Sequence, residues 1–183
     1  MAPAAVQEQL RLLLRRHAVL RGDFVLSSGQ RSDYYLDARL VTLSSAGAWL
    51  VGRAFLERFA GHEVNGVAGL AIGADPIVAA IATCAGSLGR HLDGFIVRKE
   101  RKEHGAGKRI EGPWRDGLRI AIVDDTLTTG ASSLEAAQEA QEAGASIHGV
   151  YALIDREQGA RAAIEGAGYS FTALFTAAEL LDQ

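Results

Sequence analysis

The stretch LRIAIVDDTLTTGAS, residues 118–132, decides the fold of this 183-residue chain. An apolar strand pattern over residues 118–123 ends in two adjacent carboxylates, Asp124 and Asp125, after which hydroxyl-bearing and small residues open a helix. Ligands of open α/β sheets bind where the strands end, and the N–H groups at the start of a helix attract phosphate. Two aspartates facing the same crevice can also accept hydrogen bonds from the vicinal hydroxyls of a ribose. The stretch therefore predicts a sugar-phosphate site.

The simplest alternative for this stretch is an ordinary strand-to-helix turn, in which one Asp or Thr caps the helix. That alternative accounts for one polar residue but not for two adjacent acids at the end of a buried strand. We therefore expect the phosphate to bind along the whole turn, where a glycine lets the backbone come close to the ligand. The predicted sugar-phosphate residues are Asp124, Asp125, Thr126, Leu127, Thr128, Thr129, Gly130, Ala131 and Ser132.

Short apolar runs alternate with helical patterns from residue 44 onward, which is typical of an α/β fold with a parallel sheet. A chain of this length fits a single domain. Strands are predicted at residues 66–69, 94–97, 118–123, 147–154 and 169–175. Helices are predicted at residues 1–17, 44–59, 76–88, 131–143 and 158–167, and a short hairpin at residues 24–26 and 33–36.

The composition is that of an ordinary globular protein, with 48% hydrophobic and 22% charged residues. A net charge of −3 gives no reason to expect a nucleic acid or a membrane as partner. The most apolar stretch, residues 64–88, is interrupted by Gly-Ala-Asp-Pro at residues 73–76, which favours a strand, a turn and a helix over a membrane span. The single cysteine, Cys84, cannot form an intramolecular disulfide, so we expect a reducing cytoplasm.

Residues 98–114 break the alternation, because they have no apolar periodicity and contain three glycines. Six basic residues and only two acidic residues lie between Arg98 and Arg109. Long irregular loops in small domains are usually functional, and a positive loop on an acidic chain suggests a polyanionic ligand. Taken alone, this basic loop (residues 98–109) could equally be a solvated surface segment.

Together these features resemble the type I phosphoribosyltransferases, whose phosphoribosyl pyrophosphate (PRPP) signature combines a strand, an acid pair, a Thr-Gly turn and a helix. The basic loop, RKERKEHG at residues 98–105, is similar to the loop R-K-E-x-K-x-H-G of the orotate phosphoribosyltransferases. The resemblance implies the type I phosphoribosyltransferase fold, with a central, mostly parallel sheet flanked by helices. It divides the single domain, residues 1–183, into a core of about residues 44–155 and a small hood of about residues 1–43 plus C-terminal elements.

The same resemblance implies a pentosyltransferase of pyrimidine (UMP) biosynthesis, which moves ribose 5-phosphate from PRPP to orotate and releases pyrophosphate. In this family the loop closes over the pyrophosphate, which implies that Arg98, Lys102 and His104 act in one site of a homodimer and Lys99 in the partner's site. Cations there stabilise the charge that the leaving pyrophosphate gains, and His104 can donate a proton. The residues implied to be catalytic are Lys99, Lys102, His104, Asp124 and Asp125. Mg²⁺ is expected to arrive with PRPP, because the sequence shows no metal site of its own.

Four residues are implied to bind orotate, namely Tyr34, Tyr35, Thr128 and Arg156. Each tyrosine could instead simply pack in the hairpin, and Arg156 taken alone could form a surface ion pair with Asp155 or Glu157. The chain departs from some family members at Ser27 and Gly73, where those members have lysines. This leaves the contacts of the pyrophosphate open, with backbone N–H groups near residues 71–73 as the expected substitute.

Two other functions fit part of the pattern. A phosphoribosyltransferase for another base would share the acid pair and the turn but carry a different loop. A regulator that senses PRPP without turnover would be expected to bring a nucleic-acid-binding extension or a basic face. The basic cluster of this chain is the catalytic-type loop, so orotate transfer is the preferred prediction.

Overall fold

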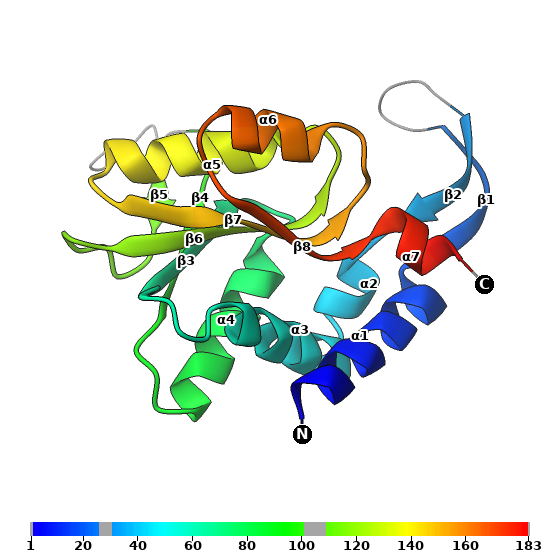
Figure 1. Ribbon diagram of the computed structural model, residues 1–183, viewed down its shortest axis with the longest axis horizontal. Helices are drawn as coiled ribbons and strands as arrows, with labels where there is room; N and C mark the ends of the chain where they lie inside the picture. Colours follow the sequence, from blue (N-terminus) through cyan, green and yellow to red (C-terminus); the bar gives the residue numbers. More distant parts are fainter. Residues whose placement is uncertain (1, 26–30, 101–108, 183) are drawn as a thin grey trace.

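A computed structural model describes residues 2–25, 31–100 and 109–182, and it shows a six-stranded sheet with helices on both faces (Figure 1). The strand order is β5-β4-β3-β6-β7-β8, and neighbours are parallel except for β5, which is antiparallel to β4. The predicted, mostly parallel α/β sheet is thus confirmed. The strands are β3 (Gly66–Leu70), β4 (Asp93–Val97), β5 (Ile110–Glu111), β6 (Arg119–Leu127), β7 (Ser146–Asp155) and β8 (Phe171–Thr176).

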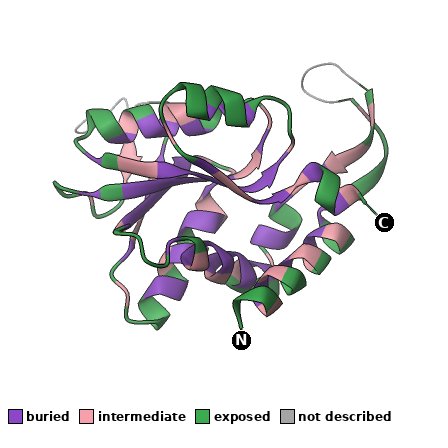
Figure 2. Cartoon of the chain, viewed as in Figure 1, coloured by how far each residue is buried: buried purple, intermediate pink, exposed green. Residues whose placement is uncertain are grey.

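The helices form one layer on each face of the sheet (Figure 1). Because both faces are covered, the strands are apolar throughout rather than alternating, and Figure 2 shows them mostly buried. The first layer contains α1 (Pro3–His17), α2 (Arg39–Thr42), α3 (Ser45–Arg58) and α4 (Asp75–Ser87). The second layer contains α5 (Ala131–Glu142) and α6 (Ala160–Gly166).

Strand β6 contributes alternate side chains to the two layers. Ile120 and Ile122 lie in the apolar cluster on the α5 side, whereas Ala121 and Val123 lie in the cluster on the α3 and α4 side. The predicted end of this strand, Val123, was too early, because pairing with β7 continues as far as Leu127. The acid pair therefore lies within a strand, where neighbouring side chains point to opposite faces.

A two-stranded antiparallel sheet, β1 (Val19–Val25) and β2 (Arg31–Leu36), lies outside the main sheet. It confirms the predicted hairpin, although the first strand begins well before residue 24. The C-terminal helix α7 (Ala177–Leu181) lies beside α1 and this hairpin (Figure 1). Arg21 on β1 donates to the carbonyl of Leu181 at 3.4 Å. Sequence reasoning did not predict α7, α2 or the two-residue β5, which are all short.

Among the described residues, no helix combines the length and the apolar character needed to cross a membrane. The apolar stretch at residues 64–88 instead forms β3, a turn and α4.

Candidate active site

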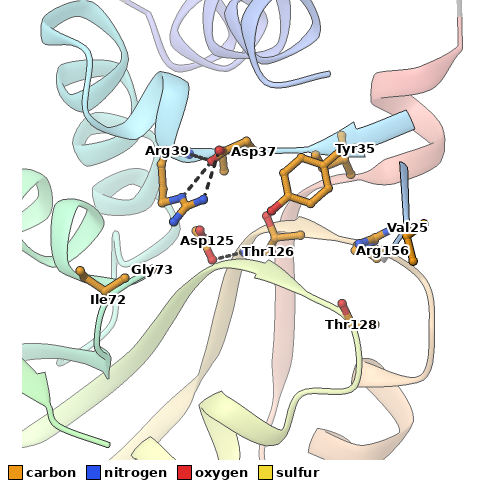
Figure 3. A pocket seen from close by; sticks show the side chains of 12 residues that line it. Val25, Tyr35, Asp37, Arg39, Ile72, Gly73, Asp125, Thr126, Thr128 and Arg156 are labelled. Atoms are coloured by element: carbon orange, nitrogen blue, oxygen red, sulfur yellow. Dashed lines mark hydrogen bonds and ion pairs between the residues drawn. The ribbon is translucent and has the colours of Figure 1, made fainter. Parts of the chain in front are cut away.

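A cavity of about 460 Å³ lies at the carboxyl ends of β3 and β6, where a ligand site of an open α/β sheet is expected (Figure 3). The end of β2 and the segment leading into α2 form one wall, and the turns after β3 and β6 form the other. Charged and hydroxyl-bearing side chains from both walls face this space. The lining residues are Val25, Tyr35, Leu36, Asp37, Ala38, Arg39, Ile72, Gly73, Asp125, Thr126, Thr128 and Arg156.

Asp125 is the carboxylate of the acid pair that lines this cavity. Its Oδ1 atom accepts a hydrogen bond of 2.7 Å from the backbone N–H of Thr126, as Figure 3 shows. A Cβ atom at residue 73 would lie only 2.8 Å from the same oxygen, so Gly73 lets the turn after β3 approach the carboxylate. Burial raises the pKa of Asp125 above its usual value. This carboxylate is thus fixed in position and open to a ligand.

Asp124 faces the other side of the sheet, which corrects the expectation that both aspartates share one crevice. Its side chain is only 6% exposed, and its two oxygens accept hydrogen bonds from the hydroxyl of Ser133 on α5 (3.1 Å) and the N–H of Asp125 (2.9 Å). Burial, reinforced by the nearby charge of Asp125, raises the pKa of Asp124 to about 7. The alternation along β6 is the physical reason, because adjacent strand residues cannot face the same side.

The start of α5 offers free backbone N–H groups beside the cavity. Gly130, the residue before the helix, has the left-handed φ of 82°, and no side chain caps the N-terminus. Thr129, Ala131 and Ser132 are exposed there. The first N–H groups of a helix have no partner within the helix, and together with the helix dipole they form an anion site. The predicted phosphate turn, residues 126–132, is therefore open to a ligand.

Three residues of this turn contribute in different ways. Thr128 lines the cavity, and the buried hydroxyl of Thr126 has no hydrogen-bond partner among the described residues. The side chain of Leu127 is buried in the core on the α5 side, so only its main chain can serve the site.

Arg156 reaches the cavity from the end of β7, and its backbone N–H donates to the carbonyl of Leu127 at 2.8 Å. Its Nε and Nη2 atoms are buried and have no hydrogen-bond partner within the described part of the chain. The two acids that could have formed a surface ion pair with it are occupied elsewhere. Asp155 accepts from the N–H of Glu157 at 2.8 Å, and Glu157 accepts from the N–H of Ala178 at 3.3 Å. Buried N–H groups without an acceptor are costly, which suggests that an anion binds these two nitrogens.

The two tyrosines of β2 separate in the same way as the two aspartates. Tyr35 lines the cavity, and its ring packs at 5.7 Å from that of Phe24. Tyr34 is not among the lining residues, and the guanidinium of Arg156 lies 5.9 Å from the centre of its ring. Tyr34 thus contacts Arg156, while Tyr35 faces the ligand space.

Of the basic loop, the structure describes residues 98–100 and 109. Arg98 pairs with Glu111 at 3.6 Å, and its backbone N–H donates to the carbonyl of Arg109 at 2.8 Å. Neither Arg98 nor Lys99 lines the cavity. Arg109 forms ion pairs with Glu135 and Glu139 on α5, which fixes one end of the loop to that helix. The predicted site residues Lys102 and His104 lie outside the described residues.

Sequence reasoning missed Arg39, a second cation in the cavity. Asp37 holds it through hydrogen bonds of 3.0 and 3.2 Å to Nε and Nη2. The signal was an Asp-x-Arg sequence directly after a strand, but one sequence could not show that the hood strand ends at the edge of the main sheet.

Comparison with known proteins assigns the family. No protein-family model matches the chain. An orotate phosphoribosyltransferase of Tropheryma whipplei is 42% identical over 179 residues, which cover 97% of this chain and 84% of the relative. A crystal structure of Mycobacterium tuberculosis orotate phosphoribosyltransferase in complex with Fe(III) dicitrate has a TM-score of 0.88 at 39% identity, covering 97% of this chain and 99% of that one.

A second structure of the Mycobacterium tuberculosis enzyme, in complex with PRPP, has a TM-score of 0.82 at 37% identity and covers 96% of this chain and 98% of that one. The sequence relative and the structures agree on one family over nearly the whole chain. The chain therefore belongs to the orotate phosphoribosyltransferase family and has the type I phosphoribosyltransferase fold.

Proposed function

We propose that this chain transfers ribose 5-phosphate from PRPP to orotate, releasing pyrophosphate and forming orotidine 5-phosphate. The observation that carries the proposal is that two buried nitrogens of the Arg156 guanidinium, Nε and Nη2, have no hydrogen-bond partner among the described residues, in the same cavity as Asp125 and beside the open start of α5. Arg156 suits a carboxylate-bearing base, Asp125 suits a ribose, and the start of α5 suits a phosphate. The planar fork of arginine suits a carboxylate particularly well.

Each part of the two substrates has a place in this arrangement. The 5-phosphate binds the free N–H groups of the turn after Thr126, and Asp125 accepts hydrogen bonds from the ribose hydroxyls. Arg156 binds the orotate carboxylate, with Thr128 beside it and the ring of Tyr35 against the base. Tyr34 acts through Arg156, which it contacts, rather than on the base directly.

The transfer breaks the bond between the ribose carbon and pyrophosphate and forms a bond from that carbon to the ring nitrogen of orotate. Positive charge develops on the ribose as pyrophosphate leaves, and the nearby carboxylate of Asp125 stabilises it. Asp124 acts through Asp125, because it accepts the backbone N–H of that residue. The loop residues Arg98, Lys99, Lys102 and His104 remain the proposed contacts of the leaving pyrophosphate.

Mg²⁺ is the proposed cofactor, and the oxygen-rich lining of the cavity suits such a hard cation. Within the described residues, no group of three or more His, Cys, Asp or Glu side chains could hold a metal. Asp125 would hold the ion together with PRPP. Mg²⁺ neutralises part of the charge of pyrophosphate when it is bound.

We also propose a homodimer in which Lys99 serves the partner's site, as the similarity of the basic loop to the family's loop implies. Exposed apolar side chains, Leu43 and Trp49, offer a contact surface for a second copy. We further propose that the chain is a single domain that works in a reducing cytoplasm, without nucleic acid or membrane as partner. The buried free thiol of Cys84 supports this compartment.

The test is a substrate panel with Mg²⁺ and PRPP, in which orotate, uracil, adenine, guanine and hypoxanthine are offered separately and the nucleotide products are identified. Orotate should be consumed fastest and yield orotidine 5-phosphate. A faster reaction with a purine would assign the chain to another base. Binding of PRPP without turnover of any base would favour a regulator.

A further inference from the structure

The cavity contains two cations at opposite ends, and the proposed function uses only one of them. Figure 3 shows Arg156 with Thr128 at one end, Arg39 with Gly73 at the other, and Asp125 between them. Arg39 and Arg156 are the two cations among the described lining residues. Arg156 is assigned to the orotate carboxylate, so Arg39 is the cation that has no assigned substrate group, and the diphosphate of PRPP is the remaining anionic group of the substrates.

The monophosphate end of the substrate is already accounted for. If the phosphate binds the start of α5 and the ribose lies on Asp125, the diphosphate extends toward Ile72 and Gly73. Gly73 itself brings no side chain, and even a Cβ atom there would lie 2.8 Å from Oδ1 of Asp125. Besides the proposed contacts of the basic loop, the opposite wall offers a cation for the diphosphate, because Arg39 lies there.

Arg39 is prepared for such a contact by Asp37. The carboxylate of Asp37 accepts from Nε, Nη2 and the backbone N–H of Arg39, which holds the guanidinium plane in one orientation. The remaining amino group, Nη1, has no partner among the described residues, and the side chain is 45% exposed. The hydrogen bonds to Asp37, and further the charges of Asp37 and Asp125, raise the pKa of Arg39, so it stays a cation at any working pH.

We infer that Arg39, oriented by Asp37, binds the diphosphate of PRPP and the pyrophosphate product; this inference rests on the proposed function. A guanidinium is suited to the task because its fork binds phosphate oxygens in pairs. Asp37 is a positioning residue, because its contact is with Arg39. A purely structural role explains the pair less well, since an exposed pair between near neighbours in sequence stabilises a fold very little.

The test compares Arg39→Gln, Arg39→Lys and Asp37→Asn with the unchanged enzyme. A matched control is Arg115→Gln, which breaks another exposed Arg–Asp pair, with Asp93, outside the cavity. For each variant, the KM values for PRPP and orotate are measured, together with inhibition by inorganic pyrophosphate and by ribose 5-phosphate. The two inhibitors separate the ends of the site, since each carries only one end of PRPP.

Arg39→Gln should raise the KM for PRPP and the inhibition constant of pyrophosphate about tenfold, the loss of one charge-assisted hydrogen bond. Inhibition by ribose 5-phosphate, the KM for orotate and the melting temperature should stay near their original values. In Arg39→Lys and Asp37→Asn, the KM for PRPP and the inhibition constant of pyrophosphate should lie between those of Arg39→Gln and the unchanged enzyme, because each variant keeps a cation but loses its orientation. Arg115→Gln should match the unchanged enzyme.

Unchanged inhibition by pyrophosphate in Arg39→Gln, or an equal loss for ribose 5-phosphate, would overturn the inference. The proposed function fails in a different way. In that case the unchanged enzyme itself would neither bind PRPP nor consume orotate.

Discussion

Asp124 and Asp125 lie side by side in β6, yet one faces α5 and the other faces the cavity. On the α5 side, Asp124 is buried and receives hydrogen bonds from Ser133 and from its neighbour's backbone. On the cavity side, Asp125 is partly exposed and lies against Gly73. The comparison teaches that two adjacent acids in a strand do not form one chemical unit. Asp124 lies behind the cavity on the α5 side, and Asp125 is the carboxylate that is open to a ligand.

The largest effect is expected from Asp124→Asn, measured as stability. Burial raises the pKa of this carboxyl from its usual 3.8 to about 7 in the folded chain. A raised pKa means that its stabilisation is complete below about pH 4 and is lost as the pH rises toward 7. Asparagine does not titrate, so the variant should become more stable than the original protein across this window, by at most about 4 kcal/mol at pH 8.

Chemical denaturation at pH 4, 6 and 8 measures this difference. Asp116→Asn, at an exposed position, is the control and should change stability by less than about 0.5 kcal/mol at every pH. If the free energy of unfolding of Asp124→Asn relative to the original protein does not increase between pH 4 and pH 8, burial does not raise the pKa of Asp124.

Asp125→Asn should have the next largest effect, and on turnover rather than stability. It removes the charge beside the ribose, so kcat should fall about a hundredfold. Turnover should fall less in Asp124→Asn, because that residue acts only through its neighbour. Steady-state assays of both variants decide the matter, and a larger loss in Asp124→Asn would reverse the roles given to the two faces of β6.

The smallest effect is expected from Gly130→Ala at the start of α5. Its φ of 82° is in the left-handed region, and a Cβ atom would lie 3.1 Å from Ile164, so the substitution should cost about 1–2 kcal/mol. Gly144→Ala is a matched control, with a φ of 91° but no atom near its Cβ and no place in the cavity. Both variants should melt earlier, but only Gly130→Ala should weaken inhibition by ribose 5-phosphate. Equal inhibition in both would remove the turn from the phosphate site.

Much of the fold could be predicted from the sequence, because its buried parallel strands are short apolar runs separated by helical patterns. The end of β6 could not be predicted. Two adjacent Asp residues are an unusual continuation of a buried strand, and the pairing with β7 keeps residues 124–127 extended. That pairing also decides which way Asp124 points. Because the extension of β6 was not predicted, the side on which Asp124 lies was not predicted either.

The candidate site was predictable where function depends on neighbours in sequence, as in the turn at residues 126–132. It was not predictable where function depends on contact between distant segments. Arg39 enters the cavity because the hairpin ends above the main sheet, and no periodicity in the sequence encodes that contact. Arg156 was expected from family resemblance, but its unpaired state is visible only once Asp155 and Glu157 are seen bound to backbone N–H groups.

The most direct test of the central claim is the Michaelis constant for orotate in Arg156→Ala. If Arg156 binds the orotate carboxylate, KM for orotate should rise at least about tenfold, while KM for PRPP stays within about twofold. Arg161→Ala is the control, because this arginine lies outside the cavity and pairs with Glu165 on α6. Equal losses for both substrates, or an unchanged KM for orotate, would contradict the account and remove Arg156 from the base site.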